Sequence, residues 1–202
     1  LPISNFVRAA LESTTARIVV LDKLTYAGRL QSLAPIAQNP RYSFVKADIA
    51  DRAAVSAIFR EYRPTAVVNL AAESHVDRSI DGPTAFVETN IVGTFELLEA
   101  SRQLLSQSGE AARRAFRFLH ISTDEVYGSL GPTGAFEETT PYQPNSVYSA
   151  SKASADHLVR AYWHTYGLPV TTTNCSNNYG PLQHDEKFVP TVIRSCIEGT
   201  RI

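Results

Sequence analysis

Short β-branched runs recur along the chain between longer segments whose apolar residues are spaced as in helices. The short runs predict five strands buried on both faces, at 17–22, 42–47, 66–71, 116–122 and 170–175. The longer segments predict helices at 51–62, about 84–105 and 149–166, with Asp51 as an N-cap and Gly167 as a C-terminal stop. Such alternation is typical of crossover units that build a parallel sheet.

The beginning of the chain departs from this alternation. Residues 4–12 predict a helix that leads into the strand at 17–22, and no strand precedes that helix. In the doubly wound strand order 3-2-1-4-5-6, the missing strand is the central one. The pattern therefore predicts a doubly wound, Rossmann-type α/β fold with a parallel sheet that lacks its first strand, and we expect the sequence to begin inside a longer parent.

Composition narrows the class of protein. With 202 residues, 44% of them hydrophobic, the chain can bury one sizeable core. Its net charge of -1 indicates neither a nucleic-acid surface nor attraction to an anionic membrane. No apolar run reaches the roughly 18 residues of a membrane span, and no signal peptide is recognisable. Cys175 and Cys196 form no CxxC pair, and the five histidines lack metal-ligand spacing, so we expect a cytoplasmic protein without disulfides or metal.

Tyr148 and Lys152 form a Tyr-x-x-x-Lys pair at the start of a predicted helix. A spacing of four residues places both side chains on one helical face, where the lysine charge can lower the pKa of the tyrosine toward the range of a useful base. An ordinary amphipathic pair has the same spacing, because short motifs of this kind are common. The pair gains weight from its place, about one loop after the strand that ends in Ser122 and Thr123.

Thr123, Asp124 and Glu125 follow that strand and put a hydroxyl and two carboxylates at the ligand edge of the sheet. Burial and mutual repulsion would separate the pKa values of the two acids, so that one acts as acid and the other as base in an elimination of water. A solvated acidic turn is the alternative interpretation.

Three further strand ends carry candidate cofactor ligands. Asp22 ends the first predicted strand, where a carboxylate can accept both hydroxyls of an adenosine ribose, which favours NAD over NADP. Asp48 closes the next strand and could lie at an adenine edge; a turn or N-cap aspartate is the alternative for both. The small residues of 69–75 would let the backbone approach a pyrophosphate or a nicotinamide ribose, or simply allow tight packing.

One glycine pattern resembles a phosphate-binding loop but lacks the helix that such a loop requires. Gly128, Gly131 and Gly134 spell G-x-x-G-x-x-G in a loop at 128–145 that also holds three prolines. Because no helix follows, there is no helix N-terminus to hold a phosphate, and we interpret the segment as a flexible loop. The Gly-rich turn expected of a dinucleotide site would precede Ser4, where residues 1–3 contain no glycine.

Taken together, five stretches resemble the extended short-chain dehydrogenase/reductases, and among them the dTDP-glucose 4,6-dehydratases. The stretches are DKLTYAG at 22–28, NLAAESHVDRSI at 69–80, HISTDEVYG at 120–128, YSASKASAD at 148–156 and NCSNNYGP at 174–181. The resemblance runs over nearly the whole chain. Related sugar epimerases and decarboxylases share the Tyr-x-x-x-Lys motif but resemble one another in carrying small or hydroxyl residues where this chain has Asp124 and Glu125.

The resemblance implies a reaction on dTDP-glucose with NAD as cofactor. Tyr148 would take the proton of the sugar 4-hydroxyl while the C4 hydride passes to NAD, with Thr123 hydrogen-bonded to that hydroxyl and Lys152 holding the cofactor ribose. Glu125 would then remove the C5 proton as Asp124 protonates the departing 6-hydroxyl, before the hydride returns to C6. The expected product is dTDP-4-keto-6-deoxyglucose.

By the same matching, the cofactor is expected to contact Tyr148 and Lys152 together with Asp22, Lys23, Thr25, Asp48, Ile49, Leu70, Ala71, Ala72, Ser74, Thr89 and Asn178. The sugar nucleotide is expected to contact Ser74, Thr123, Asp124, Glu125, Asn177 and Lys187. Residues 1–175 then form an NAD-binding domain, and 176–202 begin a substrate-binding region. The resemblance also implies a homodimer through the helices at 84–105 and 149–166.

Two departures from the family pattern leave alternatives open. The family's first strand with its glycine loop, and most of its C-terminal substrate region, have no counterpart in this sequence, so the activity of this chain alone is an open question. One alternative is a sugar-nucleotide epimerase or decarboxylase, against which the Asp124 and Glu125 pair counts. The other is a non-catalytic remnant that serves as an interaction surface through its long helices.

Overall fold

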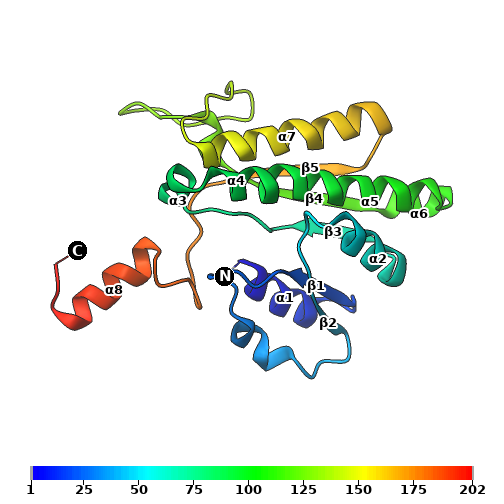
Figure 1. The fold of residues 1–202 in the computed structure, drawn as a ribbon, viewed down its shortest axis with the longest axis horizontal. Coiled ribbons are helices and arrows are strands. Elements are labelled where there is room, and N and C mark those ends of the chain that lie inside the picture. The colour runs from blue at the N-terminus through cyan, green and yellow to red at the C-terminus, as the bar shows by residue number, and fades with distance from the viewer. Residues whose placement is uncertain (1, 202) are drawn as a thin grey trace. The chain divides into compact units, whose positions relative to one another are not determined.

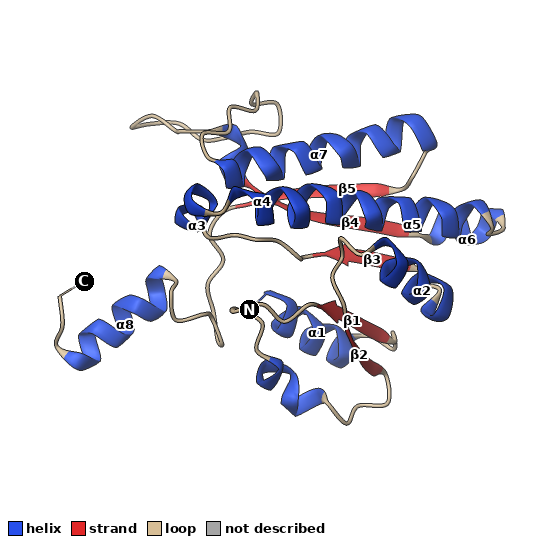
Figure 2. Ribbon diagram, in the orientation of Figure 1, coloured by secondary structure: helices blue, strands red, loops and turns tan. Residues whose placement is uncertain are grey.

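A computed structural model describes residues 2–201, which fall into two compact units (Figures 1 and 2). Unit 1 joins Leu1–Lys46 to Asn177–Ile202, and unit 2 is Ala47–Ser176. Helices and parallel strands alternate along the chain, which confirms the predicted α/β class. The last strand ends at Cys175.

Unit 1 is a small helix-on-sheet unit. The parallel strands β1 and β2 pair with Ile18 opposite Tyr42, and Val7 and Leu11 of α1 pack against Val20 of β1 in its core. Val7 and Leu11 are four residues apart and so share one helical face. The elements of this unit are α1 (Pro2–Ser13), β1 (Ile18–Asp22), the 3-10 helix η1 (Leu30–Ile36), β2 (Tyr42–Lys46) and α8 (Phe188–Glu198).

Unit 2 holds a three-stranded parallel sheet in the order β3-β4-β5. The long helices α5 and α7 pack against each other, and α7 runs along β4 and β5 (Figures 1 and 2). The elements of this unit are α2 (Arg52–Tyr62), β3 (Ala66–Asn69), α3 (Val76–Asp81), α4 (Pro83–Phe86), the π-helix η2 (Val87–Gly93), α5 (Thr94–Ser106), α6 (Glu110–Ala115), β4 (Arg117–Thr123), the 3-10 helix η3 (Asp124–Tyr127), α7 (Val147–Tyr166) and β5 (Val170–Cys175).

The predicted helix ends of unit 2 are confirmed. The Asp51 carboxylate accepts hydrogen bonds from Ala53 N and Ala54 N at 2.9 and 3.1 Å, which satisfies donors that the first helical turn leaves free. Gly167 ends α7 with φ 65°, a left-handed conformation that glycine adopts without a steric cost. The predicted helix at 84–105 is confirmed as the continuous segment α4–η2–α5, although its π-turn was not predicted.

The expectation that every strand is buried on both faces is wrong. β4 alternates between fully buried residues and more exposed ones, whereas β1, β2, β3 and β5 are mostly half-buried or exposed. The reason is position: among the described strands only β4 has a neighbour on each side, and the others are edge strands. The strands form two separate sheets, β1-β2 and β3-β4-β5. A doubly wound sheet that lacks its central first strand would be divided in this way.

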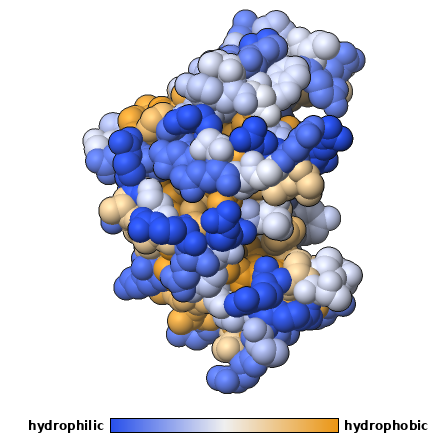
Figure 3. Space-filling model, turned by 90° about the vertical axis from the view of Figure 1, so that its right-hand side faces the viewer, coloured by the Kyte–Doolittle hydropathy of each residue, from blue (hydrophilic) through white to orange (hydrophobic). Residues whose placement is uncertain are grey.

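Polar and apolar residues both reach the surface of the protein. Hydrophilic residues cover most of the face drawn in Figure 3, with hydrophobic ones showing between them. Within residues 2–201, no helix is both long and apolar enough to cross a membrane.

Candidate active site

The end of β4 holds three of the predicted catalytic residues. Thr123 is the last residue of the strand, and its hydroxyl caps η3 by accepting a hydrogen bond from Glu125 N at 3.2 Å. The same hydroxyl donates to Asp124 Oδ1 at 3.3 Å. The short 3-10 turn therefore fixes two half-buried carboxylates immediately beyond a buried strand end.

The first turn of α7 brings Tyr148 to this strand end. A reciprocal capping box fixes that turn, because Ser149 N donates to Ser146 Oγ and Ser146 N donates to Ser149 Oγ, both at 3.0 Å. Tyr148 is 9% exposed, its ring meets Phe86 edge-on, and its hydroxyl is hydrogen-bonded to the side chain of Thr123. The fold thus places Tyr148 beside the end of β4.

The ionisation of Tyr148 differs from the prediction. Burial raises the pKa of Tyr148 to about 12, and the carboxylates of Glu125 and Asp124 and the thiol of Cys175 add to the rise, while the hydrogen bond with Thr123 opposes it. We expected Lys152 to lower this pKa; that expectation is wrong for the structure described, because loss of hydration dominates. Tyr148 is therefore a neutral phenol near pH 7.

Lys152 lies one turn after Tyr148 and is 3% exposed. Its ammonium donates to the carbonyl oxygen of Ile121 at 2.6 Å. Burial lowers the pKa of Lys152 to about 8, against the opposing charge of Asp156. An ammonium has three N–H donors, and this bond is the one found for it among the described residues, so two donors remain for a ligand such as a ribose hydroxyl.

Asn90 supports this arrangement and was missed in the sequence. It lies in the π-turn η2 and is 1% exposed. Its amide nitrogen donates to Glu73 O at 3.0 Å and Ser151 Oγ at 2.9 Å, and its oxygen accepts from Glu73 N at 2.9 Å. Asn90 therefore ties the segment after β3 to α7. A polar amide at a buried helical position was the available signal, since such a group needs partners.

The remaining predicted residues of unit 2 lie near the ends of β2 and β3 and in η2. Asp48 Oδ1 accepts a hydrogen bond from Ala50 N at 2.9 Å. This contact is the one expected of a turn aspartate, which was the alternative to an adenine contact. Ile49 is 5% exposed, and its side chain lies where a Cβ on Gly93 would have to be. Leu70, Ala71 and Ala72 are half-buried, Ser74 is exposed and Thr89 is buried.

Unit 1 holds the other predicted ligands. Asp22 ends β1, and its Oδ1 accepts from Leu24 N at 2.7 Å, which leaves the second carboxylate oxygen available for a ribose. The loop after β1 meets the segment before α8, where Tyr26 donates to Glu186 at 3.2 Å and Arg29 pairs with Asp185 at 3.2 Å. The predicted residues Lys23 and Thr25 belong to that loop, and Asn177, Asn178 and Lys187 to the segment that leads into α8.

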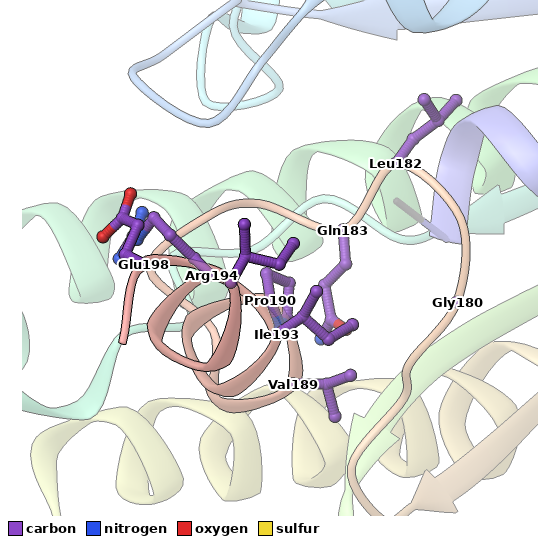
Figure 4. A pocket seen from close by; sticks show the side chains of 9 residues that line it. Gly180, Leu182, Gln183, Val189, Pro190, Ile193, Arg194 and Glu198 are labelled. Carbon is purple, nitrogen blue, oxygen red and sulfur yellow. The ribbon is translucent and has the colours of Figure 1, made fainter. Parts of the chain in front are cut away.

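A pocket in unit 1 contains none of the predicted site residues. It lies between α8 and the loop before it, with Val189, Pro190 and Ile193 on the helix and Leu182 and Gln183 on the loop (Figure 4). Its lining is mainly apolar, in contrast to the carboxylates and hydroxyls at the end of β4. The predicted catalytic residues lie elsewhere, at the end of β4 and in the first turns of η3 and α7.

Comparison with known proteins agrees with this geometry. A family model described as GDP-mannose 4,6 dehydratase matches residues 4–201. The chain is 60% identical over 195 residues to a dTDP-glucose 4,6-dehydratase of Xanthomonas campestris pv. campestris (strain B100), which covers 96% of this chain and 55% of that relative. The chain thus spans about half the length of the curated relatives it matches.

Two solved structures share the fold. The dTDP-glucose 4,6-dehydratase of Bacillus anthracis in complex with NAD is 43% identical, with a TM-score of 0.84 over 97% of this chain and 58% of that chain. The UDP-glucose 4-epimerase of Thermus thermophilus in complex with NAD is 29% identical, with a TM-score of 0.83 over 98% of this chain and 60% of that chain. Backbone likeness alone does not separate dehydratase from epimerase, so that distinction depends on side chains.

The parallel sheets, with Tyr148 and Lys152 beside the end of β4, define a Rossmann-type short-chain dehydrogenase/reductase. Within that class, the chain belongs to the GDP-mannose 4,6-dehydratase family. The family description and the named relatives differ in nucleotide and hexose, and the choice between them is a question of function.

Proposed function

We propose that this chain carries the catalytic residues of a dTDP-glucose 4,6-dehydratase that uses NAD. The observation that carries the proposal is the hydrogen bond between Tyr148 and Thr123, with the carboxylates of Asp124 and Glu125 directly after Thr123. Oxidation alone would need only the tyrosine, hydroxyl and lysine. Two adjacent acids supply what an elimination of water needs in addition, namely one proton acceptor and one proton donor.

The first stage is removal of hydrogen from C4 of the hexose. Tyr148 takes the proton of the 4-hydroxyl, and Thr123 holds that hydroxyl by a hydrogen bond. Bound NAD would supply the acceptor for the C4 hydride and its donor at C6, and the positive charge of the oxidised ring would favour ionisation of Tyr148. The sugar becomes a 4-ketone, and its C5 proton becomes acidic because the adjacent carbonyl can stabilise the resulting charge.

The second stage is loss of water across C5 and C6. Glu125 removes the C5 proton, and Asp124 gives its proton to the departing 6-hydroxyl, so a water molecule leaves. Addition of a hydride at C6 and a proton at C5 then gives the 4-keto-6-deoxy sugar. The two acids need different protonation states for these roles, one as proton acceptor and the other as proton donor.

The cofactor residues are proposed by the same reasoning. Two free ammonium donors on Lys152 suit a ribose, and the second oxygen of Asp22 suits the adenosine ribose. The others proposed for NAD are Lys23, Thr25, Asp48, Ile49, Leu70, Ala71, Ala72, Ser74, Thr89 and Asn178. Ser74, Asn177 and Lys187 are proposed to contact the sugar nucleotide together with the catalytic residues. Residues 1–175 would then be the NAD-binding domain, and 176–202 the start of the substrate-binding region.

The setting is proposed as cytoplasmic, and the state as a homodimer. Among the described residues, neither Cys175 nor Cys196 forms a disulfide, which suits a reducing compartment. The long helices leave large apolar side chains in water, among them Val92 of η2 and Trp163 and Tyr166 of α7, at 39%, 54% and 55% exposure. Such residues favour burial against a second copy.

Product analysis tests the proposed function. The chain is incubated with NAD and dTDP-glucose, and the masses of the sugar nucleotides are measured by mass spectrometry. A dehydratase gives a product lighter by one water, and Tyr148→Phe abolishes it without lowering the melting temperature by more than about 3 °C. An isomer of unchanged mass would instead support the epimerase, and no conversion by a cooperatively melting chain would refute activity of this chain.

A further inference from the structure

A buried polar cluster adjoins the candidate site, between β4, β5 and α7. At its centre is Asp156 of α7, which is 5% exposed. Its Oδ2 accepts hydrogen bonds from the hydroxyls of Ser122 at 2.7 Å and Tyr142 at 3.0 Å, and from the amide of Asn174 at 3.4 Å. None of these residues has a role in the proposed reaction. A carboxylate so removed from water requires partners, and here it has several.

The cluster holds the peptide that carries Thr123. Ser122 directly precedes Thr123 and pairs with Asn174 across the β4–β5 ladder. The Asn174 amide donates to Thr123 O at 3.3 Å as well as to Asp156. The carboxylate of Asp156 therefore fixes the strand end directly through Ser122 and indirectly through Asn174. A shift of either contact would move the Thr123 hydroxyl relative to Tyr148, to which it is hydrogen-bonded.

His120 lies beside the second oxygen of this carboxylate as a neutral ring. The ring is fully buried, its Nε2 lies 3.3 Å from Asp156 Oδ1, and its Nδ1 lies 3.3 Å from the amide nitrogen of Asn69. An amide nitrogen can only donate, so Nδ1 accepts and the ring proton is on Nε2, facing Asp156. Burial lowers the pKa of His120, and the charge of Lys152 lowers it further, so the ring is neutral near pH 7.

Lys152 supplies the balancing charge. It precedes Asp156 by one helical turn, and the negative charge of Asp156 opposes the effect of burial on the pKa of Lys152. The titratable groups that feel the charge of Asp156 are His120 on β4, Tyr127 on η3, Tyr142 in the loop before α7, and Lys152 on α7 itself. Lys152 is the one among them that carries a charge near pH 7.

We propose that Asp156 is a positioning residue for the dehydratase: it holds Thr123 in place through Ser122 and Asn174, and it keeps the ammonium form of Lys152 in the buried site. The inference rests on the proposed function for its catalytic consequence, but its electrostatic part concerns the protein alone. Asp156 touches neither substrate nor cofactor in this account. It acts through Thr123, which is proposed to contact the sugar, and Lys152, which is proposed to contact the cofactor.

Asp156→Asn tests the inference because the amide has the same shape and no charge. The matched control is Glu99→Gln in α5, which also removes a carboxylate bonded to a tyrosine hydroxyl, that of Tyr162 at 2.5 Å. The four lysines of the sequence are labelled at Cε for NMR, and Lys152 is assigned by its loss in Lys152→Met. We expect Asp156→Asn to move the titration of Lys152 to lower pH, and Glu99→Gln to leave it unchanged.

Turnover is the second readout. Asp156→Asn is expected to lower kcat for dehydration at least about tenfold while KM changes less than about threefold, because a displaced Thr123 acts mainly in the transition state. Ser122→Ala removes the shortest bond to Asp156 and keeps every charge, so it should lower kcat severalfold without moving the Lys152 titration. This variant also carries the test if Asp156→Asn fails to fold.

The outcomes separate the inference from the proposed function. If the unaltered chain forms no dehydrated product, the proposed function fails, and the titration of Lys152 still decides the electrostatic claim. If the chain is active but Asp156→Asn resembles Glu99→Gln in titration and turnover, the inference is overturned. A normal kcat in a folded Ser122→Ala variant would overturn the positioning of Thr123.

Discussion

At the scale of single residues, burial sets the protonation states of Lys152 and Tyr148 in the candidate site. Lys152 keeps a pKa of about 8 although it is 3% exposed, which is low for a lysine and still high enough for the ammonium to dominate near pH 7. Tyr148 shows the opposite shift for the same physical reason, since burial disfavours the charged form of either group. The ligand-free site thus holds a protonated phenol beside a protonated amine.

The buried lysine makes stability depend on pH. Between about pH 8 and pH 10.5 the unfolded chain binds the Lys152 proton and the folded chain does not, so stability rises with pH by up to about 3 kcal/mol from this group. Lys152→Met lacks this contribution. Denaturant unfolding of both proteins from about pH 7 to pH 10 should show the unaltered chain gaining relative to the variant. Parallel pH dependences would contradict the shifted pKa.

At the scale of elements, the end of the π-turn η2 packs closely against Ile49. A Cβ placed on Gly93 would lie 2.5 Å from Cδ1 and Cγ1 of Ile49, so alanine there would force the Ile49 side chain to shift although the φ of −60° is helical. Gly93→Ala should therefore destabilise the protein by about 1–3 kcal/mol through overpacking, despite the better helix propensity of alanine. Urea unfolding measures the loss.

A glycine without neighbours provides the control for that substitution. Gly109 is the N-cap residue of α6, and a Cβ there would meet no atom within 4 Å, so Gly109→Ala should change stability by less than about 1 kcal/mol. Adding Ile49→Ala to Gly93→Ala should cost less than the sum of the single changes, because truncation makes room for the new methyl group. Additive losses would show that the contact does not cause the effect.

The elements also show what could be predicted from the sequence. The strands at 42–47, 116–122 and 170–175 were placed within a residue or two, because β-branched runs between helical segments leave few alternatives. The helices α3, α6 and α8 were not predicted. α3 and α6 have six residues each, which is too few to show a clear helical periodicity. The π-turn was missed because its residues follow the same helical periodicity as the segments on either side of it.

The candidate site was predictable in part. Short motifs identified Thr123, Asp124, Glu125, Tyr148 and Lys152, which the fold gathers at one strand end. The supporting residues Asn90 and Asp156 were not identified, because their roles come from hydrogen bonds between segments far apart in the sequence. The sign of the Tyr148 pKa shift was also wrong, since a helical spacing does not reveal how deeply a side chain is buried.

At the scale of the whole molecule, the proposed function requires the folded chain to bind NAD. Binding of NAD to the folded chain should therefore raise the melting temperature in a saturable way, by an amount that corresponds to about 2.7 kcal/mol at a hundred times Kd. Thermal scans across a cofactor titration measure this. Asp22→Ala should weaken the response, and Glu99→Gln should preserve it; a melting temperature insensitive to NAD would contradict cofactor binding by this chain.

The central claim is that the strand end of unit 2 eliminates water from a sugar nucleotide. Its most direct test is the reaction with dTDP-glucose and NAD in heavy water, read by mass spectrometry and NMR. We predict a product lighter by one water that carries one deuterium at C5, because Glu125 removes the C5 proton and the proton returned there has exchanged with solvent. A sugar nucleotide of unchanged mass, with no deuterium on its ring carbons, would contradict the claim.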